Sequence, residues 1–260
     1  MKRHLTVLVV VTCCCAFELG AQATRPPSIE LPLLDRDNVS HGLRGPSMAQ
    51  SLALSAAFYE ISHYAIEERL EQRPWLTRWM VALFDIGVSL IAPLPFSDVW
   101  IHEEWHRAVM SNRGVDSYND VYKFAIATDA ISVSEVRDED LIRLKRDHPA
   151  DLPRLHVAGI EGEYALVQRL QRNKFFDRTR GYHIPIYFIS KVSSAGYVGS
   201  GTSSETTTET HEWEREEGVD VSKRDFAGHD FTAWIYDMSR RDEPYAARGL
   251  HPSGVGIRRY

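Results

Sequence analysis

The sequence predicts a mainly α-helical protein (α+β) with a small β element and one apolar helix that is a candidate for membrane association. Two observations predict this class. Apolar residues recur at three- and four-residue steps through most of the chain, and only a short segment near residue 131 alternates as a strand does. The composition, with 43% hydrophobic and 25% charged residues in a chain of 260, is that of a globular protein of one large or two small domains.

The first 23 residues match a secretory signal peptide. Lys2 and Arg3 precede an apolar stretch at 5–17, and Ala21-Gln22-Ala23 supplies the small residues that a signal peptidase recognises. An uncleaved membrane anchor is the alternative. All three cysteines of the chain lie in this leader, so the mature chain is expected to form no disulfide. We therefore expect an exported protein of a bacterial periplasm or cell envelope, with membrane association as an alternative.

The mature chain begins with a proline-containing, extended lead-in at 24–46. A helical period then runs from Ser47 to Pro74, where the proline ends it. The next segment, 75–96, is the most apolar of the mature chain and is long enough to cross a bilayer. Asp85 in its middle disfavours insertion, so a buried core helix or a helix that dips into the membrane is favoured over a spanning helix.

The remaining elements follow from local patterns. Ser97 and Asp98 predict the start of a helix over 99–110. Further along we expect a short strand within 131–136, helices over 138–148 and 152–170, an apolar segment at 182–198 that fits either helix or strand, and a short helix over 225–238. The predicted organisation is a catalytic helical domain at 47–198, a polar Gly/Ser/Thr/Glu-rich linker or loop at 199–217, and a C-terminal segment at 218–260 that could be truncated.

One motif carries chemistry. His102-Glu103-Glu104-Trp105-His106 matches HExxH, in which two imidazoles bind one zinc ion and the intervening glutamate is the general base. Residues four apart on a helix lie on the same face, so both rings can point at one ion. Apolar neighbours share that face, whereas Glu104 and Arg107 point the other way. The alternative is a pair of core histidines, each satisfied by a hydrogen bond.

The segment 101–108 resembles the active-site helix of zincin metallopeptidases. The helix over 152–170 looks like the second ligand helix of the gluzincin branch, in which a glutamate completes the zinc site. The nearby apolar helices make the layout similar to that of the membrane-linked CAAX-protease-like and HtpX-like peptidases. The resemblance covers these two short helices, and it implies a zincin-like helical core.

A catalytic zinc ion needs a third protein ligand and an open position for water. The helix over 152–170 offers His156, Glu161 and Glu163. Glu161 falls on a polar stripe of the helical wheel, whereas Glu163 lies in an apolar stripe, where a lone carboxylate needs a cation or a donor. Glu163 is therefore the predicted third ligand, beside His102 and His106, and Glu161 and His156 are the alternatives.

The pattern departs from the CAAX-protease-like group in one respect. That group places an aspartate four residues after its ligand glutamate, where this chain has Val167 or Ala165, so the group that orients a zinc-bound histidine must come from elsewhere. His229 and Asp230 are candidates, and a cluster at a helix start is the alternative interpretation. For stabilising an oxyanion the candidates are Tyr182, His183 and Tyr187, unless these form an aromatic patch of the core.

These observations predict a zinc metalloendopeptidase of the cell envelope, in which Glu103 assists the attack of water on a peptide bond of a protein or peptide substrate. The strand within 131–136 would pair with the extended substrate. Two rivals are a non-catalytic binding or assembly protein with a structural or absent metal, and a membrane-anchored zinc enzyme acting on a non-peptide amide. The net charge of −6 and the lack of basic runs argue against a nucleic-acid partner, and the oligomeric state stays open.

Overall fold

Long α-helices form most of the computed structural model, which describes residues 45–124, 131–177, 184–200 and 230–245. The helices are α3 (Met48–Arg69), α4 (Pro74–Ile86), α5 (Asp98–Ser111), α6 (Asp138–Asp147), α7 (Asp151–Asp177), α8 (Ile184–Ser200) and α10 (Asp230–Ser239). A π-helical turn, η1 (Gly87–Ile91), continues α4, and a 3₁₀ turn, η2, covers Asp120–Lys123. Helices make up 76% of the described residues, which confirms the predicted class.

The strands β1 (Tyr118–Asn119) and β2 (Val133–Ser134) supply the small β element. They form one antiparallel ladder, in which Tyr118 faces Ser134 and Asn119 faces Val133. The predicted strand within 131–136 is thus present but two residues long. The leader at 1–23, the lead-in at 24–46 up to residue 44, and the polar linker from residue 201 onward lie outside the described residues.

Local signals set the starts of α3 and α5 close to where the sequence predicts them, whereas Pro74, predicted to end the first helix, begins α4 after α3 has ended at Arg69. Ser47 and Gln50 form a reciprocal capping box at the start of α3, Pro74 occupies the first turn of α4, and the side chain of Ser97 accepts a hydrogen bond from the backbone of Trp100 in α5. The segment at 182–198, whose pattern fits either helix or strand, is helical from Ile184 onward and forms α8. Since α8 continues to Ser200, the expected start of the linker at 199 falls inside this helix.

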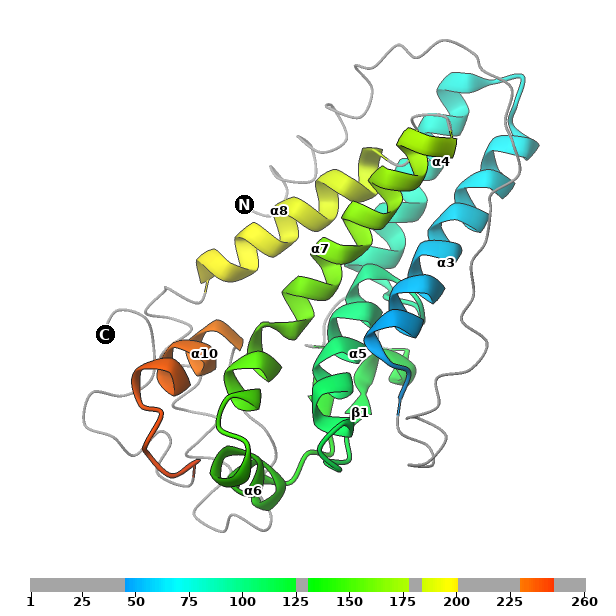
Figure 1. Cartoon of the computed structure of the whole chain (residues 1–260). Helices are drawn as coiled ribbons and strands as arrows, with labels where there is room; N and C mark the ends of the chain where they lie inside the picture. Colours follow the sequence, from blue (N-terminus) through cyan, green and yellow to red (C-terminus); the bar gives the residue numbers. More distant parts are fainter. Residues whose placement is uncertain (1–44, 125–130, 178–183, 201–229, 246–260) are drawn as a thin grey trace.

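The helices α5 and α7 lie side by side at the centre of the bundle, and theirs is the most extensive contact between two helices (Figure 1). Gly162 permits the close approach, because a methyl group on it would lie 2.9 Å from Cγ of Trp105 and 3.2 Å from the carbonyl oxygen of Ile101. The core around this contact is built from Trp100, Ile101, Leu141, Leu144, Leu152, Leu155, Leu166 and Leu170, each at most 3% exposed.

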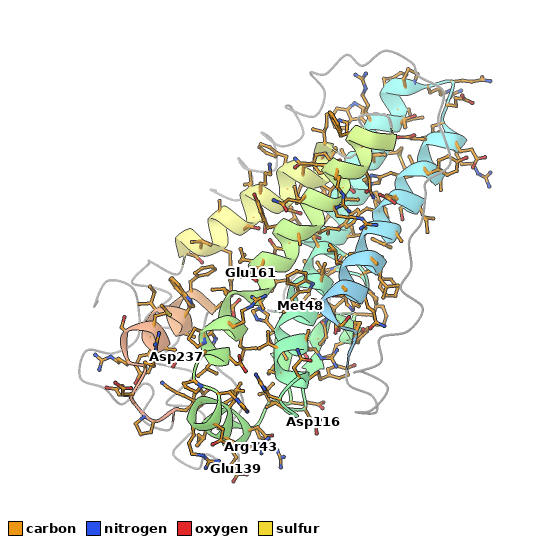
Figure 2. The ribbon with its side chains drawn as sticks, in the orientation of Figure 1. Met48, Asp116, Glu139, Arg143, Glu161 and Asp237 are labelled. Carbon is orange, nitrogen blue, oxygen red and sulfur yellow. The ribbon has the colours of Figure 1, made fainter. Side chains whose placement is uncertain are left out.

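The remaining helices surround this pair. The helix α3 packs along both of them, α8 packs on α7, α4 packs on α3 and α8, and α10 packs against the N-terminal half of α7 (Figure 1). The described part of the segment at 218–260 therefore packs on the helical domain through α10. A buried network holds it there: Asp237 of α10 (labelled in Figure 2) contacts Nζ of Lys145 at 2.7 Å and Nε2 of His156 at 2.8 Å.

Candidate metal centre

The two histidines of the HExxH motif share one buried face of α5. His102 is 8% exposed and His106 6%, and their ring centroids lie 4.9 Å apart. The predicted i, i+4 alignment is therefore present. Glu104 and Arg107 point elsewhere, as expected, but they are buried too: Arg107 donates to both oxygens of Glu104, and Asn119 donates to one of them.

Asp230, the first residue of α10, completes a group of three donors with these histidines. Its Oδ2 lies 3.3 Å from Nε2 of His102 and 3.2 Å from Nε2 of His106. All three donor atoms lie within 4.8 Å of one another. Donors bonded to a tetrahedral zinc ion at about 2.0–2.1 Å stand roughly 3.3 Å from each other, so these two separations fit such an ion.

A glycine of α7 makes room for this group. A methyl group on Gly159 would lie 2.5 Å from Nε2 of His106 and closer still to Nε2 of His102, which no real Cβ atom can do. The backbone of α7 therefore comes directly against the two nitrogens that face Asp230. A residue with any side chain would fill the space in which an ion shared by the three donors would lie.

The second nitrogen of each ring is held by α7. Nδ1 of His102 lies 2.7 Å from Oε1 of Glu163, and Nδ1 of His106 lies 2.6 Å from the carbonyl oxygen of Leu155. A histidine that donates Nδ1–H to an acceptor presents its Nε2 lone pair to a metal ion, so both partners select the tautomer that metal binding requires. The other carboxylate oxygen of Glu163 accepts a hydrogen bond from Ser194 of α8.

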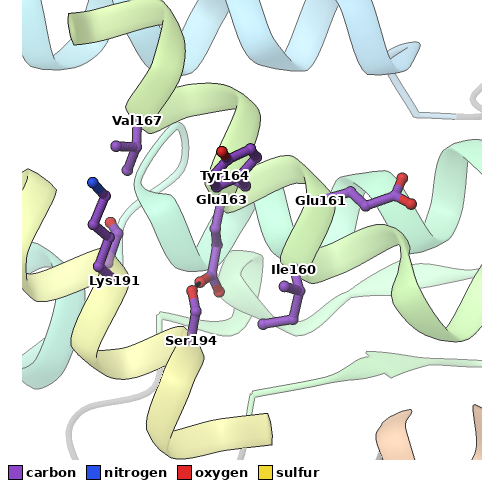
Figure 3. A pocket seen from close by; sticks show the side chains of 8 residues that line it. Ile160, Glu161, Glu163, Tyr164, Val167, Lys191 and Ser194 are labelled. Carbon is purple, nitrogen blue, oxygen red and sulfur yellow. Dashed lines mark hydrogen bonds between the residues drawn. The ribbon is translucent and has the colours of Figure 1, made fainter.

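Glu163 and Asp230 therefore each lie where the sequence analysis expected the other. Glu163, the predicted third ligand, contacts the nitrogen of His102 that points away from the three-donor group. Asp230, considered from sequence for orienting a histidine, lies against both inner nitrogens. The alternatives for the third ligand lie outside the group: Glu161 is exposed and pairs with Arg154, and His156 pairs with Asp237. Figure 3 shows Glu163 turned toward Ser194 and Glu161 pointing away from both.

Electrostatics tie the three residues together. Burial lowers the pKa of both histidines, but hydrogen bonds and charge from Asp230, with Glu163 acting on His102, raise each above its ordinary value. For Asp230, burial acts in the opposite direction and raises the pKa. The adjacent charges of His106 and His102 outweigh this effect and hold the pKa far below its usual range. A buried carboxylate and two buried imidazoles therefore form a strongly coupled cluster, the donor chemistry of a divalent metal site.

Glu103 lies beside this cluster and is 7% exposed. Burial raises the pKa of its carboxyl to about 7, an effect that His102 and His106 partly offset. Within the described residues, no group hydrogen-bonds this carboxyl. A carboxylate with a pKa near neutrality can both accept and return a proton at physiological pH.

Tyr197 of α8 is a site residue that the sequence analysis missed. Its ring centroid lies 5.7 Å from that of His102, and its hydroxyl oxygen accepts a hydrogen bond of 3.4 Å from the backbone nitrogen of Asp230. Burial, with the charge of Asp230, raises its pKa well above 10. A helical wheel over α8 would have placed it one turn beyond Ser194, but the segment could not be assigned as a helix.

Of the two tyrosines predicted to stabilise an oxyanion, the one that the structure describes lies away from the histidines. Tyr187 is buried at the start of α8, where burial and the nearby charges of Glu60 and Asp85 raise its pKa, so it is not brought to the histidines. Tyr182, His183 and His229 lie outside the described residues.

A cavity of about 380 Å³ opens between α7 and α8 next to Glu163 (Figure 3). Its walls are Ile160, Glu161, Glu163, Tyr164, Val167, Ser190, Lys191 and Ser194. The hydrogen bond between Ser194 and Glu163 forms one end of it. The cavity is therefore adjacent to the carboxylate that contacts Nδ1 of His102.

No protein-family profile, curated protein or solved structure matches this chain. What the chain does is therefore inferred from the arrangement of its own side chains.

Proposed function

We propose that the chain is a zinc-dependent hydrolase that cleaves peptide bonds, with His102, His106 and Asp230 as the metal ligands and Glu103 as the general base. One observation carries this proposal: an HExxH helix and a carboxylate 128 residues away from its first histidine converge on one buried point. Two imidazoles and one carboxylate form a donor set that zinc uses in catalytic sites.

The residues around the ligands have separate tasks. Glu163 and the carbonyl group of Leu155 hold the rings so that both Nε2 atoms face Asp230. A bound zinc ion would polarise a substrate carbonyl and acidify water. Glu103 takes a proton from water that attacks the carbonyl carbon and passes it to the leaving amine, which its pKa of about 7 suits.

The proposal keeps the substrate class, the metal and the site of action that the sequence predicts. The substrate is a protein or peptide, the metal is zinc, and the site of action is the cell envelope, to which the leader at 1–23 would direct the chain. A non-peptide amide is the alternative substrate for the same chemistry. A binding protein that carries a structural metal is the alternative for the whole chain.

The decisive experiment compares the purified full-length protein with Glu103→Gln and, as a matched control, Glu161→Gln. Metal content is measured by mass spectrometry, and hydrolysis with fluorescently labelled casein and a labelled non-peptide amide. We expect one zinc ion per chain in all three proteins, casein hydrolysis in the wild type and the control, and none in Glu103→Gln.

Other results overturn parts of the proposal. A wild type that binds zinc but hydrolyses neither probe is a binding protein with a structural metal. Hydrolysis of the amide probe alone rejects the peptidase. A wild type without stoichiometric zinc rejects both enzyme proposals.

A further inference from the structure

The segment made of α4, η1 and the residues that follow exposes large apolar side chains on one continuous stretch. Seven of them are between 37% and 65% exposed: Trp75, Trp79, Met80, Leu83, Leu90, Ile91 and Leu94. Over Pro74–Ile91 the mean hydropathy of 1.2 and the length of 18 residues suffice to cross a membrane, by length and composition only, and 39% of this window is buried. We call these seven residues the α4 face.

The polar side chains of the same segment, apart from the half-buried Arg78, point into the protein. Thr77, Asp85 and Ser89 are at most 6% exposed. Asp85 lies 2.7 Å from Nε2 of His63 in α3, where both side chains are buried. The helix also buries Val81, Ala82 and Ile86, but a helix on the surface of a water-soluble protein is expected to expose polar side chains, not a run of large apolar ones.

The partner helix α3 also buries polar residues beside its apolar ones, Ala56, Ala57 and Tyr59. Its buried polar residues are Ser51, Ser55, Glu60, His63 and Glu67, each at most 7% exposed, whereas Ile61 is 47% exposed. Polar groups paired inside a helical bundle, with apolar side chains outside, are the arrangement found in lipid, because hydrocarbon cannot satisfy an exposed polar group.

Charge is absent from the α4 face for a long distance. Between Arg78 and Asp98 the chain has one charged residue, Asp85, and it is buried. At the N-terminal end of the face, Trp75 and Trp79 lie beside Arg73 and Arg78. Tryptophan and arginine are the residues that mark the boundary between membrane hydrocarbon and lipid headgroups.

We infer that the α4 face contacts the hydrocarbon of a lipid bilayer, with Trp75 and Trp79 near the headgroups. A protein partner fits this face less well, since interfaces between proteins form about one hydrogen bond per 100–200 Å². In the α4 face, only the two indole N–H groups can donate a side-chain hydrogen bond. The inference is independent of the proposed metal centre.

The test reads the position of the two tryptophans directly, since the apolar leader could itself hold the full chain on a membrane. The full-length protein is mixed with vesicles of phosphatidylcholine and phosphatidylglycerol, with or without bromine on the acyl chains. Bromine quenches tryptophan fluorescence at short range. We expect brominated vesicles to quench the wild type, Trp75→Phe/Trp79→Phe to lose at least half of that quenching, and the control Trp234→Phe to keep it.

A second pair of variants changes the face without removing the probes. Leu83→Lys/Leu90→Lys places two charges on the α4 face, and it should lower the quenching at least twofold. Gln168→Lys/Gln171→Lys adds the same charge to exposed positions of α7 and should leave the quenching unchanged. Equal quenching in the wild type and in Trp75→Phe/Trp79→Phe overturns the inference. So does an unquenched wild type, whether the chain stays monomeric or covers the face with a second copy.

Discussion

Oδ2 of Asp230 lies 3.3 Å from Nε2 of His102, although 128 residues separate the two along the chain. The short helix α10 brings the carboxylate to the histidine, and α10 is in turn held on α7 by Asp237. The candidate metal centre is therefore assembled from two distant parts of the chain, and each part can be tested separately.

Removing Asp230 should cost more zinc affinity than removing Glu163. Loss of the hydrogen-bond partner of a metal-binding histidine weakens binding by roughly 10- to 100-fold, and loss of a ligand weakens it further. We expect Glu163→Gln to weaken zinc binding by a factor within that range and Asp230→Ala to weaken it by more than about 100-fold. Zinc titration against a chelator of known affinity measures both, with Glu161→Gln as the control. The reverse order would restore Glu163 as the third ligand.

Gly159→Ala should abolish zinc binding, because the added methyl group would lie 2.5 Å from Nε2 of His106. The matched control is Gly196→Ala in α8, where a methyl group meets nothing within 4 Å. In a helix this control should raise stability by roughly 0.5–1 kcal/mol and leave zinc content unchanged. Metal analysis and thermal unfolding of both variants provide the readouts. Full zinc content in Gly159→Ala would contradict the position assigned to the ion.

Lys145→Met should weaken zinc binding, although Lys145 is not a ligand. Its Nζ lies 2.7 Å from Oδ1 of Asp237, and both side chains are buried, so the substitution leaves a buried carboxylate without its cation. Since Asp237 holds α10, we expect Asp230 to be positioned poorly and zinc affinity to fall by roughly tenfold or more.

The control for this prediction is Lys123→Met, which removes an exposed ion pair with Asp120 and should change little. Zinc affinity and the near-ultraviolet circular dichroism of the protein are measured together. Unchanged affinity in a folded Lys145→Met protein would separate the docking of α10 from the metal centre.

Asp98 should make the free energy of unfolding depend on pH. Burial, together with the charge of Glu163, raises its pKa from 3.8 to about 6. The folded chain therefore binds this proton more tightly than the unfolded chain does, so the stabilisation is complete below pH 3.8 and is lost as the pH rises through 6. Between pH 4 and pH 7, the wild type should lose about 2 kcal/mol relative to Asp98→Asn.

Denaturant unfolding of both proteins at several pH values measures this difference. Asp98→Asn also alters hydrogen bonds from Tyr59 and Ser190, an effect that is present at every pH and does not change the slope. A difference between the two proteins that stays constant from pH 4 to pH 7, or grows in favour of the wild type, would show that Asp98 is ionised throughout.

Local patterns were sufficient for most of the helices and for the alignment of the two histidines. The starts of α3 and α5, next to Ser47 and Ser97, follow from capping, which acts within one turn, whereas Pro74 was expected to end a helix and instead begins one. The alignment of His102 and His106 follows from helix geometry alone. The segment at 182–198 could not be assigned, because its mixture of apolar and small residues fits either period. The position of Tyr197 beside His102 therefore could not be predicted either.

The carboxylates show where local patterns stop. Glu163 does lie near a histidine, as a lone carboxylate in an apolar stripe suggested, but a helical wheel cannot tell which ring nitrogen it will meet. Likewise, an exposed apolar face and a buried one give the same hydropathy over 75–96. Which side of α4 is covered depends on how α3 pairs with it through His63 and Asp85.

By itself, the sequence determined the helical class, the starts of α3 and α5 and the i, i+4 pair of imidazoles, because backbone hydrogen bonds and side-chain periodicity act over a few residues. Only the tertiary structure decided that Asp230 meets both histidines, that Glu163 orients one of them from behind, and that Gly159 leaves room between α7 and the rings. These relationships depend on the packing of α5, α7 and α10, which are far apart in the chain, and packing is selected by shape and by buried charge pairs.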